Sequence, residues 1–180
     1  MPLAIGSEVS DAQLDGFVGQ LREGRIEVVF NHGGIGVYER LIRRVRAAGM
    51  STVFQAVNSG STQLAAHLGP LAHGMVFTQV VPSPWERKTA LTRQYQQAFG
   101  AAFSGQPFSY GSLEGYVTLL ALVEALKRAG RGLTRQSLLN ALGDASFDIA
   151  GYKLRYRSGE HTGSTFVDTA IVTKDGLFRH

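Results

Sequence analysis

The sequence predicts an α/β fold in which a parallel sheet is flanked by helices. Within residues 11–81, apolar residues at helical spacing alternate with short β-branched runs, and short connections join them. This alternation of helix and strand indicates a parallel sheet covered by helices. The loops after the strands then open at one edge of the sheet, which is where open α/β sheets bind ligands.

The alternation begins with a helix predicted over residues 11–22 and a strand over residues 26–30. Apolar residues recur along the helix at spacings of three and four, and Gly24 ends it. These apolar residues are Leu14, Phe17, Val18 and Leu21. The strand is a β-branched run bounded by glycines, as is typical of a buried strand.

A glycine-rich loop, NHGGIG, joins this strand to a helix over residues 37–48 that Gly49 ends. The inward positions of the helix are Tyr38, Leu41, Ile42 and Val45, and the outward ones include Arg40, Arg43, Arg44 and Arg46. The chain has a formal net charge of +4, for which a nucleic-acid surface is one interpretation. The arginines fit the solvated face of one amphipathic helix, so we expect no nucleic-acid partner.

The alternation continues with a strand over residues 51–57 and the loop NSGS at residues 58–61. A short helix up to Leu68 and a third strand over residues 75–81 follow. The three predicted strands and three predicted helices of this part form one α/β segment, residues 1–81.

The pattern changes at Pro82 and Pro84, because proline blocks both a helix interior and a central strand. Three helices then follow without a strand: residues 86–103, residues 112–128, and a helix that Thr134 caps and that runs to Leu142. The helix over residues 112–128 carries apolar residues on two sides, so we expect both sides to be buried. Residues 82–148 are therefore a helical segment.

The end of the chain, residues 149–180, returns to β structure. Residues 152–157 and 165–173 are strand-like, and Asp175-Gly176 is a strong turn signal. Hydrophobic residues make up 44% of the 180 residues, which is enough for a core, and no uncharged apolar stretch is long enough for a membrane span. The chain has no cysteine, which excludes disulfides, thiolate metal sites and cysteine nucleophiles.

Motifs for catalysis or cofactors are missing. The loop at residues 31–36 lets a ligand approach backbone N–H groups at a helix N-terminus, and tight-turn packing is an equally good explanation of its glycines. The dinucleotide fingerprint is incomplete, and neither a phosphate-binding P-loop nor a GxSxG elbow occurs. The histidines lack metal-ligand spacing. We expect no cofactor and no metal, and a binding module rather than an enzyme.

Three longer stretches resemble the branched-chain amino-acid receptor family of type I periplasmic solute-binding proteins. SYGSLEGYVTLLALVEALKRAG (residues 109–130) looks like a helix of that family. LTRQSLLNALGDASFDIAGYKLRY (residues 133–156) with TFVDTAIVTKDGLF (residues 165–178) is similar to its C-terminal end. VVFNHGGIGVYERLIRRVRAAGM (residues 28–50) resembles the strand, glycine loop and helix of its second lobe.

The resemblance implies two α/β lobes that close on a ligand and feed an ABC importer. Family chains are about twice as long, so this one looks like a C-terminal half that lacks most of the first lobe. Residues 1–81 would belong to the second lobe, residues 82–148 would pack on the first, and residues 149–180 would return to the second. The hinge crossings would lie near residues 81–84 and 147–151. The location would be periplasmic, with the export signal outside this chain.

The resemblance also implies a ligand site at the ends of two strands. The matching residues are His32, Gly33, Gly34, Ile35, Asn58 and Ser59. Amino-acid receptors usually place an acid where Asn58 stands, to hold the ammonium group. Because an amide lacks that charge, an organic acid, an aromatic acid or an amide-like solute is favoured over an α-amino acid.

The expected partners are a small-molecule solute and, in the intact protein, an ABC permease. The helix over residues 112–128 lacks the first-lobe sheet here, and an exposed apolar face invites association. A homodimer or swapped assembly is therefore expected. A ligand-sensing regulatory domain of the same fold is the main alternative function, and an α/β enzyme is the third.

Overall fold

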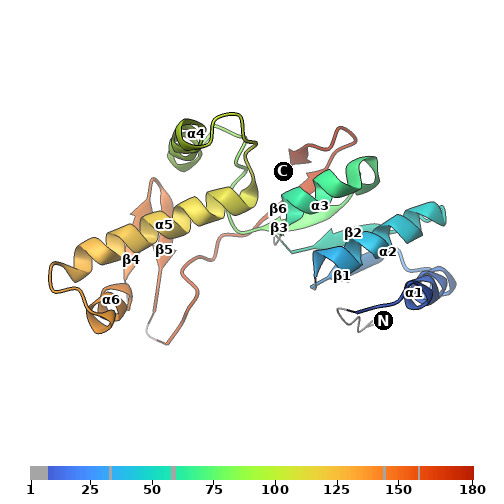
Figure 1. Cartoon of the computed structure of the whole chain (residues 1–180), viewed down its shortest axis with the longest axis horizontal. Helices are drawn as coiled ribbons and strands as arrows, with labels where there is room; N and C mark the ends of the chain where they lie inside the picture. Colours follow the sequence, from blue (N-terminus) through green and yellow to red (C-terminus); the bar gives the residue numbers. More distant parts are fainter. Residues whose placement is uncertain (1–7, 33, 58–59, 144, 158) are drawn as a thin grey trace. The chain divides into compact units, whose positions relative to one another are not determined.

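The computed structural model of the chain describes residues 8–32, 34–57, 60–143, 145–157 and 159–180. The chain divides into two compact units, whose elements are labelled in Figure 1. Unit 1 comprises Met1–Gln79 and Thr169–His180, and unit 2 comprises Val80–Asp168.

Unit 1 is built on a five-stranded sheet in the order β1-β2-β3-β6-β7. β1, β2 and β3 are parallel, whereas β6 and β7 pair as an antiparallel hairpin. The strands are β1 (Val28–Asn31), β2 (Val53–Ala56), β3 (Val76–Gln79), β6 (Asp168–Val172) and β7 (Phe178–Arg179). The prediction of an α/β fold with a largely parallel sheet is confirmed.

Three helices cover one face of this sheet: α1 (Asp11–Glu23), α2 (Ile35–Ala47) and α3 (Ser61–Leu68), followed by the 3₁₀ turn Gly69–Ala72. Their apolar faces meet alternate residues of the strands in one core. Its fully buried members include Leu14, Leu21, Leu41, Ile42, Phe54, Met75 and Phe77. Ser10 caps α1 in a capping box with Gln13, which satisfies backbone N–H groups at the start of the helix.

α1 ends at Glu23 with Gly24 as its C-cap, as the sequence predicted, but the left-handed residue comes one position later. Gly24 has an ordinary right-handed φ of −74°, and Arg25 takes the left-handed position with a φ of +47°. The Arg25 N–H donates to the Arg22 carbonyl and the Ile26 N–H donates to the Leu21 carbonyl. This is the Schellman pattern, which glycine usually supplies.

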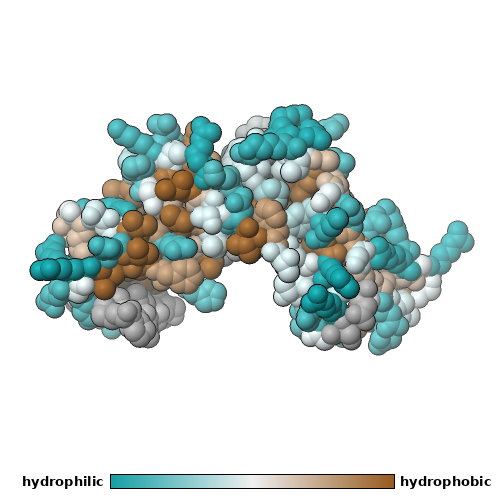
Figure 2. All heavy atoms as spheres, turned by 180° about the vertical axis from the view of Figure 1, so that it is seen from behind, coloured by the Kyte–Doolittle hydropathy of each residue, from teal (hydrophilic) through white to brown (hydrophobic). Residues whose placement is uncertain are grey.

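The other face of the sheet is bare in unit 1. Val28, Phe30 and Ile171 lie there and are 54%, 58% and 46% exposed, although all three are apolar. Val28 pairs with Val53, which is 39% exposed on the same face. Figure 2 shows hydrophobic residues gathered on this unit, on the left of the view, where the sheet is seen from behind. Parallel sheets usually have both faces covered, so this bare sheet face is an exception.

Unit 2 combines three helices with a β-hairpin (Figure 1). Its elements are α4 (Ala90–Ala102), α5 (Tyr110–Ala129), α6 (Arg135–Leu142), β4 (Ser146–Ile149) and β5 (Tyr152–Arg155). Thr89, Ser109 and Thr134 cap the three helices through their hydroxyls, as Thr134 was predicted to do. Among the described residues, no helix is both long and apolar enough to cross a membrane.

Only one side of α5 is buried, contrary to the expectation that both are. Leu113 and Val117 lie in the core of unit 2, whereas Leu119 and Leu122 are 57% and 41% exposed. The exposed α5 face continues the apolar surface that Phe103, 57% exposed, presents at the end of α4.

The boundary of the last segment also differs from the predicted one. The hairpin of β4 and β5 packs on α5, where the Arg128 guanidinium donates to the Ser146 carbonyl and lies 4.1 Å from the centre of the Phe147 ring. Because of this packing, residues 149–168 belong to unit 2, and the chain returns to unit 1 at Thr169 rather than near Phe147–Gly151.

Candidate functional site

The carboxyl ends of the parallel strands of unit 1 form one edge of the sheet. In the register of β1 and β2, the last residues Asn31 and Ala56 are partners, so the loops after both strands begin side by side. An edge of this kind presents loop residues and helix N-termini to a ligand. It is the edge at which the sequence places the ligand site.

The first loop contributes His32, Gly34 and Ile35 to this edge. His32 and Gly34 are exposed, and Ile35 is half-buried as the first residue of α2. Gly34 is the N-cap of α2. Because glycine has no side chain, it makes no hydrogen bond to the first backbone N–H groups of the helix. Gly33 lies outside the described residues.

The second loop approaches the first through Gly60. A Cβ atom placed on Gly60 would lie 1.9 Å from Cδ1 of Ile35, so a larger residue fits only if the end of the Ile35 side chain moves away. Gly60 also has a left-handed φ of +68°. Asn58 and Ser59 lie outside the described residues, but the next residue places the start of α3 beside the start of α2.

Gln79 is a polar residue of this edge that the sequence analysis missed. It ends β3, is fully buried, and donates from Nε2 to the Ser61 hydroxyl at 3.1 Å. Within the described part of the chain, its Oε1 and the hydroxyl of Thr62 are buried without a hydrogen-bond partner. Buried polar groups are usually paired, so two such groups at the start of α3 mark a polar edge. The signal in the sequence was a glutamine at the end of an apolar strand.

Three arginines of α2 contact acidic side chains. Arg40 and Arg44 contact Asp11 at 2.5 and 2.6 Å, and Arg43 contacts Glu39 at 2.7 Å. The hydrogen bond from Arg40 and the charge of Arg44 lower the pKa of Asp11. Arg46, the fourth arginine of this helix, donates instead to the carbonyls of Met50 and Thr52.

The described residues contain no cluster of three or more His, Asp or Glu side chains that could hold a metal ion.

In unit 2, Trp85 and Tyr110 meet edge to face with ring centres 5.2 Å apart. Burial raises the pKa of Tyr110 above its usual range.

The comparisons with known proteins agree with this architecture. The family model described as periplasmic binding protein matches residues 5–176. A possible leucine/isoleucine/valine-binding protein from Rhodopirellula baltica is 28% identical, with a TM-score of 0.82, over 94% of this chain and 47% of that one. An extracellular ligand-binding receptor from Verminephrobacter eiseniae is 24% identical, with a TM-score of 0.81, over 94% and 49%.

A branched-chain amino-acid ABC transporter protein from Thermus thermophilus, solved with bound valine, has a TM-score of 0.73 at 18% identity, over 96% of this chain and 50% of that one. No curated protein sequence matches the chain. The chain thus spans about half the length of the solved structures that it matches. Because the family model extends over nearly all 180 residues, this chain belongs to the periplasmic binding protein family.

Proposed function

We propose that this chain is part of the substrate-binding component of an ABC-type importer that takes up an amino acid or an organic or aromatic acid. The observation that carries this proposal is the fold: a family sheet whose two strand-end loops meet at Gly60 and Ile35. The similar structure from Thermus thermophilus is a branched-chain amino-acid ABC transporter protein with bound valine, which supports this role. The role would be reversible binding without bond chemistry, in the periplasm, with an ABC permease as the partner of the intact protein.

The proposal includes that the chain is a fragment or truncated form. One support for this comes from the structure: the bare sheet face and the exposed α5 face are apolar surfaces of a kind that intact domains usually cover. The coverage of 47% to 50% of the similar structures points the same way. A fragment of this kind would carry only part of the ligand contacts.

Titration calorimetry tests the binding proposal with L-leucine, L-valine, benzoate and phenylacetate as ligands. We expect weak binding of the carboxylates, with a Kd of roughly a millimolar, which corresponds to only about −4 kcal/mol. His32→Ala should weaken it further. Asn58→Asp should favour the amino acids by about tenfold or more, because a hydrogen bond to a charged group contributes about 1.5–3 kcal/mol.

Ala66, exposed on α3, provides the matched control for these variants: Ala66→Asp adds the same charge away from the loops and should change nothing. Tight, submicromolar binding of one solute by the isolated chain would contradict the fragment. Equal responses of Asn58→Asp and Ala66→Asp would contradict the site.

We also propose that the chain forms a homodimer or swapped assembly that covers the exposed α5 face. Leu119→Lys with Leu122→Lys should shift the mass measured by light scattering from dimer to monomer, since two charges would be buried at the contact. Gln97→Lys, on an exposed position of α4, should leave the dimer intact. A wild-type monomer that binds little hydrophobic dye would show the proposal to be wrong.

A further inference from the structure

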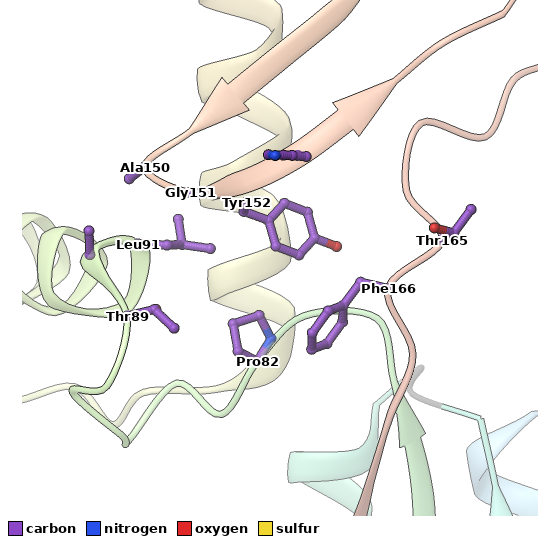
Figure 3. Close-up of a pocket in the computed structure, with 10 residues that line it drawn as sticks. Pro82, Thr89, Leu91, Ala150, Gly151, Tyr152, Thr165 and Phe166 are labelled. Carbon is purple, nitrogen blue, oxygen red and sulfur yellow. The ribbon is translucent and has the colours of Figure 1, made fainter.

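Unit 2 contains a cavity of about 610 Å³ that is separate from the strand-end loops of unit 1. Figure 3 shows it between the start of α4, the tip of the β4–β5 hairpin and the segment that precedes β6. Its volume lies in the range of about 300–1,000 Å³ that is usual for small-molecule sites. No residue of the predicted ligand loops lines it.

The floor of the cavity is apolar and held in place. Leu91, Pro82, Phe166 and the ring of Tyr152 extend toward the same space in Figure 3. The rings of Tyr152 and Phe166 lie 5.7 Å apart, and Leu91 is only 1% exposed.

The Tyr152 hydroxyl fixes its ring from two sides. It donates to the Val80 carbonyl at 2.5 Å and shares a hydrogen bond of 2.7 Å with the Ser164 hydroxyl. Burial raises the pKa of Tyr152, so the hydroxyl stays neutral and remains a donor. A floor that is already ordered loses little entropy when an apolar molecule binds.

Among the described residues, the lining carries one positive charge and no negative one. Lys153 is exposed, and within the described residues its ammonium group has no ion pair or hydrogen bond. Asp148 faces it in the hairpin register, but the Asp148 Oδ1 accepts a hydrogen bond from the Gly151 N–H at 2.6 Å. Thr89 and Thr165 add exposed hydroxyls beside the cavity.

A strained residue lies at the cavity wall. Ala150, in the two-residue turn with Gly151, has a φ of +51°, a conformation that favours glycine or asparagine in hairpin turns. Left-handed residues other than glycine cost free energy and cluster at ligand sites. Ala150 is one of the residues that line the cavity.

From the apolar floor, the single unpaired cation and the strained wall, we infer that this cavity binds a small amphiphilic carboxylate as an accessory site of unit 2. The hydrocarbon or aromatic body of the ligand lies on Leu91, Pro82 and Phe166. The carboxylate meets the Lys153 ammonium and a threonine hydroxyl. The site is independent of the proposed function, because it shares no residue with the strand-end loops.

The test is NMR or calorimetric titration of the full chain with octanoate, beside 1-octanol and octylamine as probes of equal length. We expect octanoate to bind at least tenfold more tightly than octylamine, with octanol between them. Lys153→Gln should remove most of the advantage of octanoate over octanol. Lys174→Gln, an exposed lysine of unit 1, should not change it.

Thr165→Phe should block the cavity for all three probes. Equal affinities for the three probes would overturn the inference, and so would octanoate binding that survives both Lys153→Gln and Thr165→Phe.

Discussion

Phe77→Ala should destabilise unit 1 by about 3–5 kcal/mol, the largest effect expected of a single substitution in this unit. Phe77 is fully buried in β3, and its ring lies 5.9 Å from that of Phe178 in β7. Removing the ring leaves a cavity between the sheet and its helices, since the core collapses only in part around a deleted side chain.

Phe30→Ala is the matched control, because it removes the same ring from β1, where it is 58% exposed. Its effect on the free energy of unfolding should stay below about 1 kcal/mol. Hydrogen exchange followed by mass spectrometry reads the two units separately, which a single unfolding curve would not do. Phe77→Ala should raise exchange in β1 to β3 and leave α5 unchanged; equal losses in both variants would mean that the bare sheet face is buried.

The alternation of β1, α2, β2, α3 and β3 could be predicted from the sequence because each element repeats its apolar residues at its own period. In α2, Tyr38, Leu41, Ile42 and Val45 lie on one side and are all buried. β4 was missed because its four residues, SFDI, include an exposed aspartate and give too short an alternation to recognise. Its pairing partner β5 is what makes it a strand, and pairing is a tertiary property.

The bare sheet face could not be predicted in the same way. Val28 and Phe30 are apolar residues of a strand, and a parallel strand covered on both faces has the same composition. Only the arrangement of α1, α2 and α3 on one face shows that these two side chains are exposed.

At the candidate site, the sequence placed His32, Gly34 and Ile35 at the end of β1, where they are found. It did not reveal Gln79, because a glutamine at a strand end has no characteristic spacing. Nor did it reveal the contact between Ile35 and Gly60, which joins residues from two loops. Whether these residues contact a solute stays a prediction.

Gly60→Ala should destabilise unit 1 by about 2–4 kcal/mol and separate the two loops of the candidate site. A left-handed φ costs a residue with a Cβ atom roughly 1–2 kcal/mol. Crowding adds about 1–2 kcal/mol, in the lower part of the usual range for overpacking, because the new methyl group would meet Cδ1 of Ile35 at 1.9 Å but that end of the side chain can turn away.

Gly49→Ala separates these two costs. Gly49 has a left-handed φ of +71°, but a Cβ atom there would meet nothing within 4 Å, so it should show the backbone cost alone. Ile35→Ala combined with Gly60→Ala should recover the crowding cost and leave that same backbone cost, added to the cost of Ile35→Ala alone. The coupling between residues 35 and 60 is measured by a double-mutant cycle. The free energy of unfolding of unit 1 is obtained for each variant in urea, with hydrogen exchange as the readout.

A coupling of at least about 1 kcal/mol would establish that the two strand-end loops hold each other in place. The loops would then be positioned before any ligand arrives, and solute selectivity would depend on the side chains they carry rather than on the closing of the loops themselves. Additive effects of Ile35→Ala and Gly60→Ala would mean that the loops do not touch in solution, and the site would have to be assembled by the ligand.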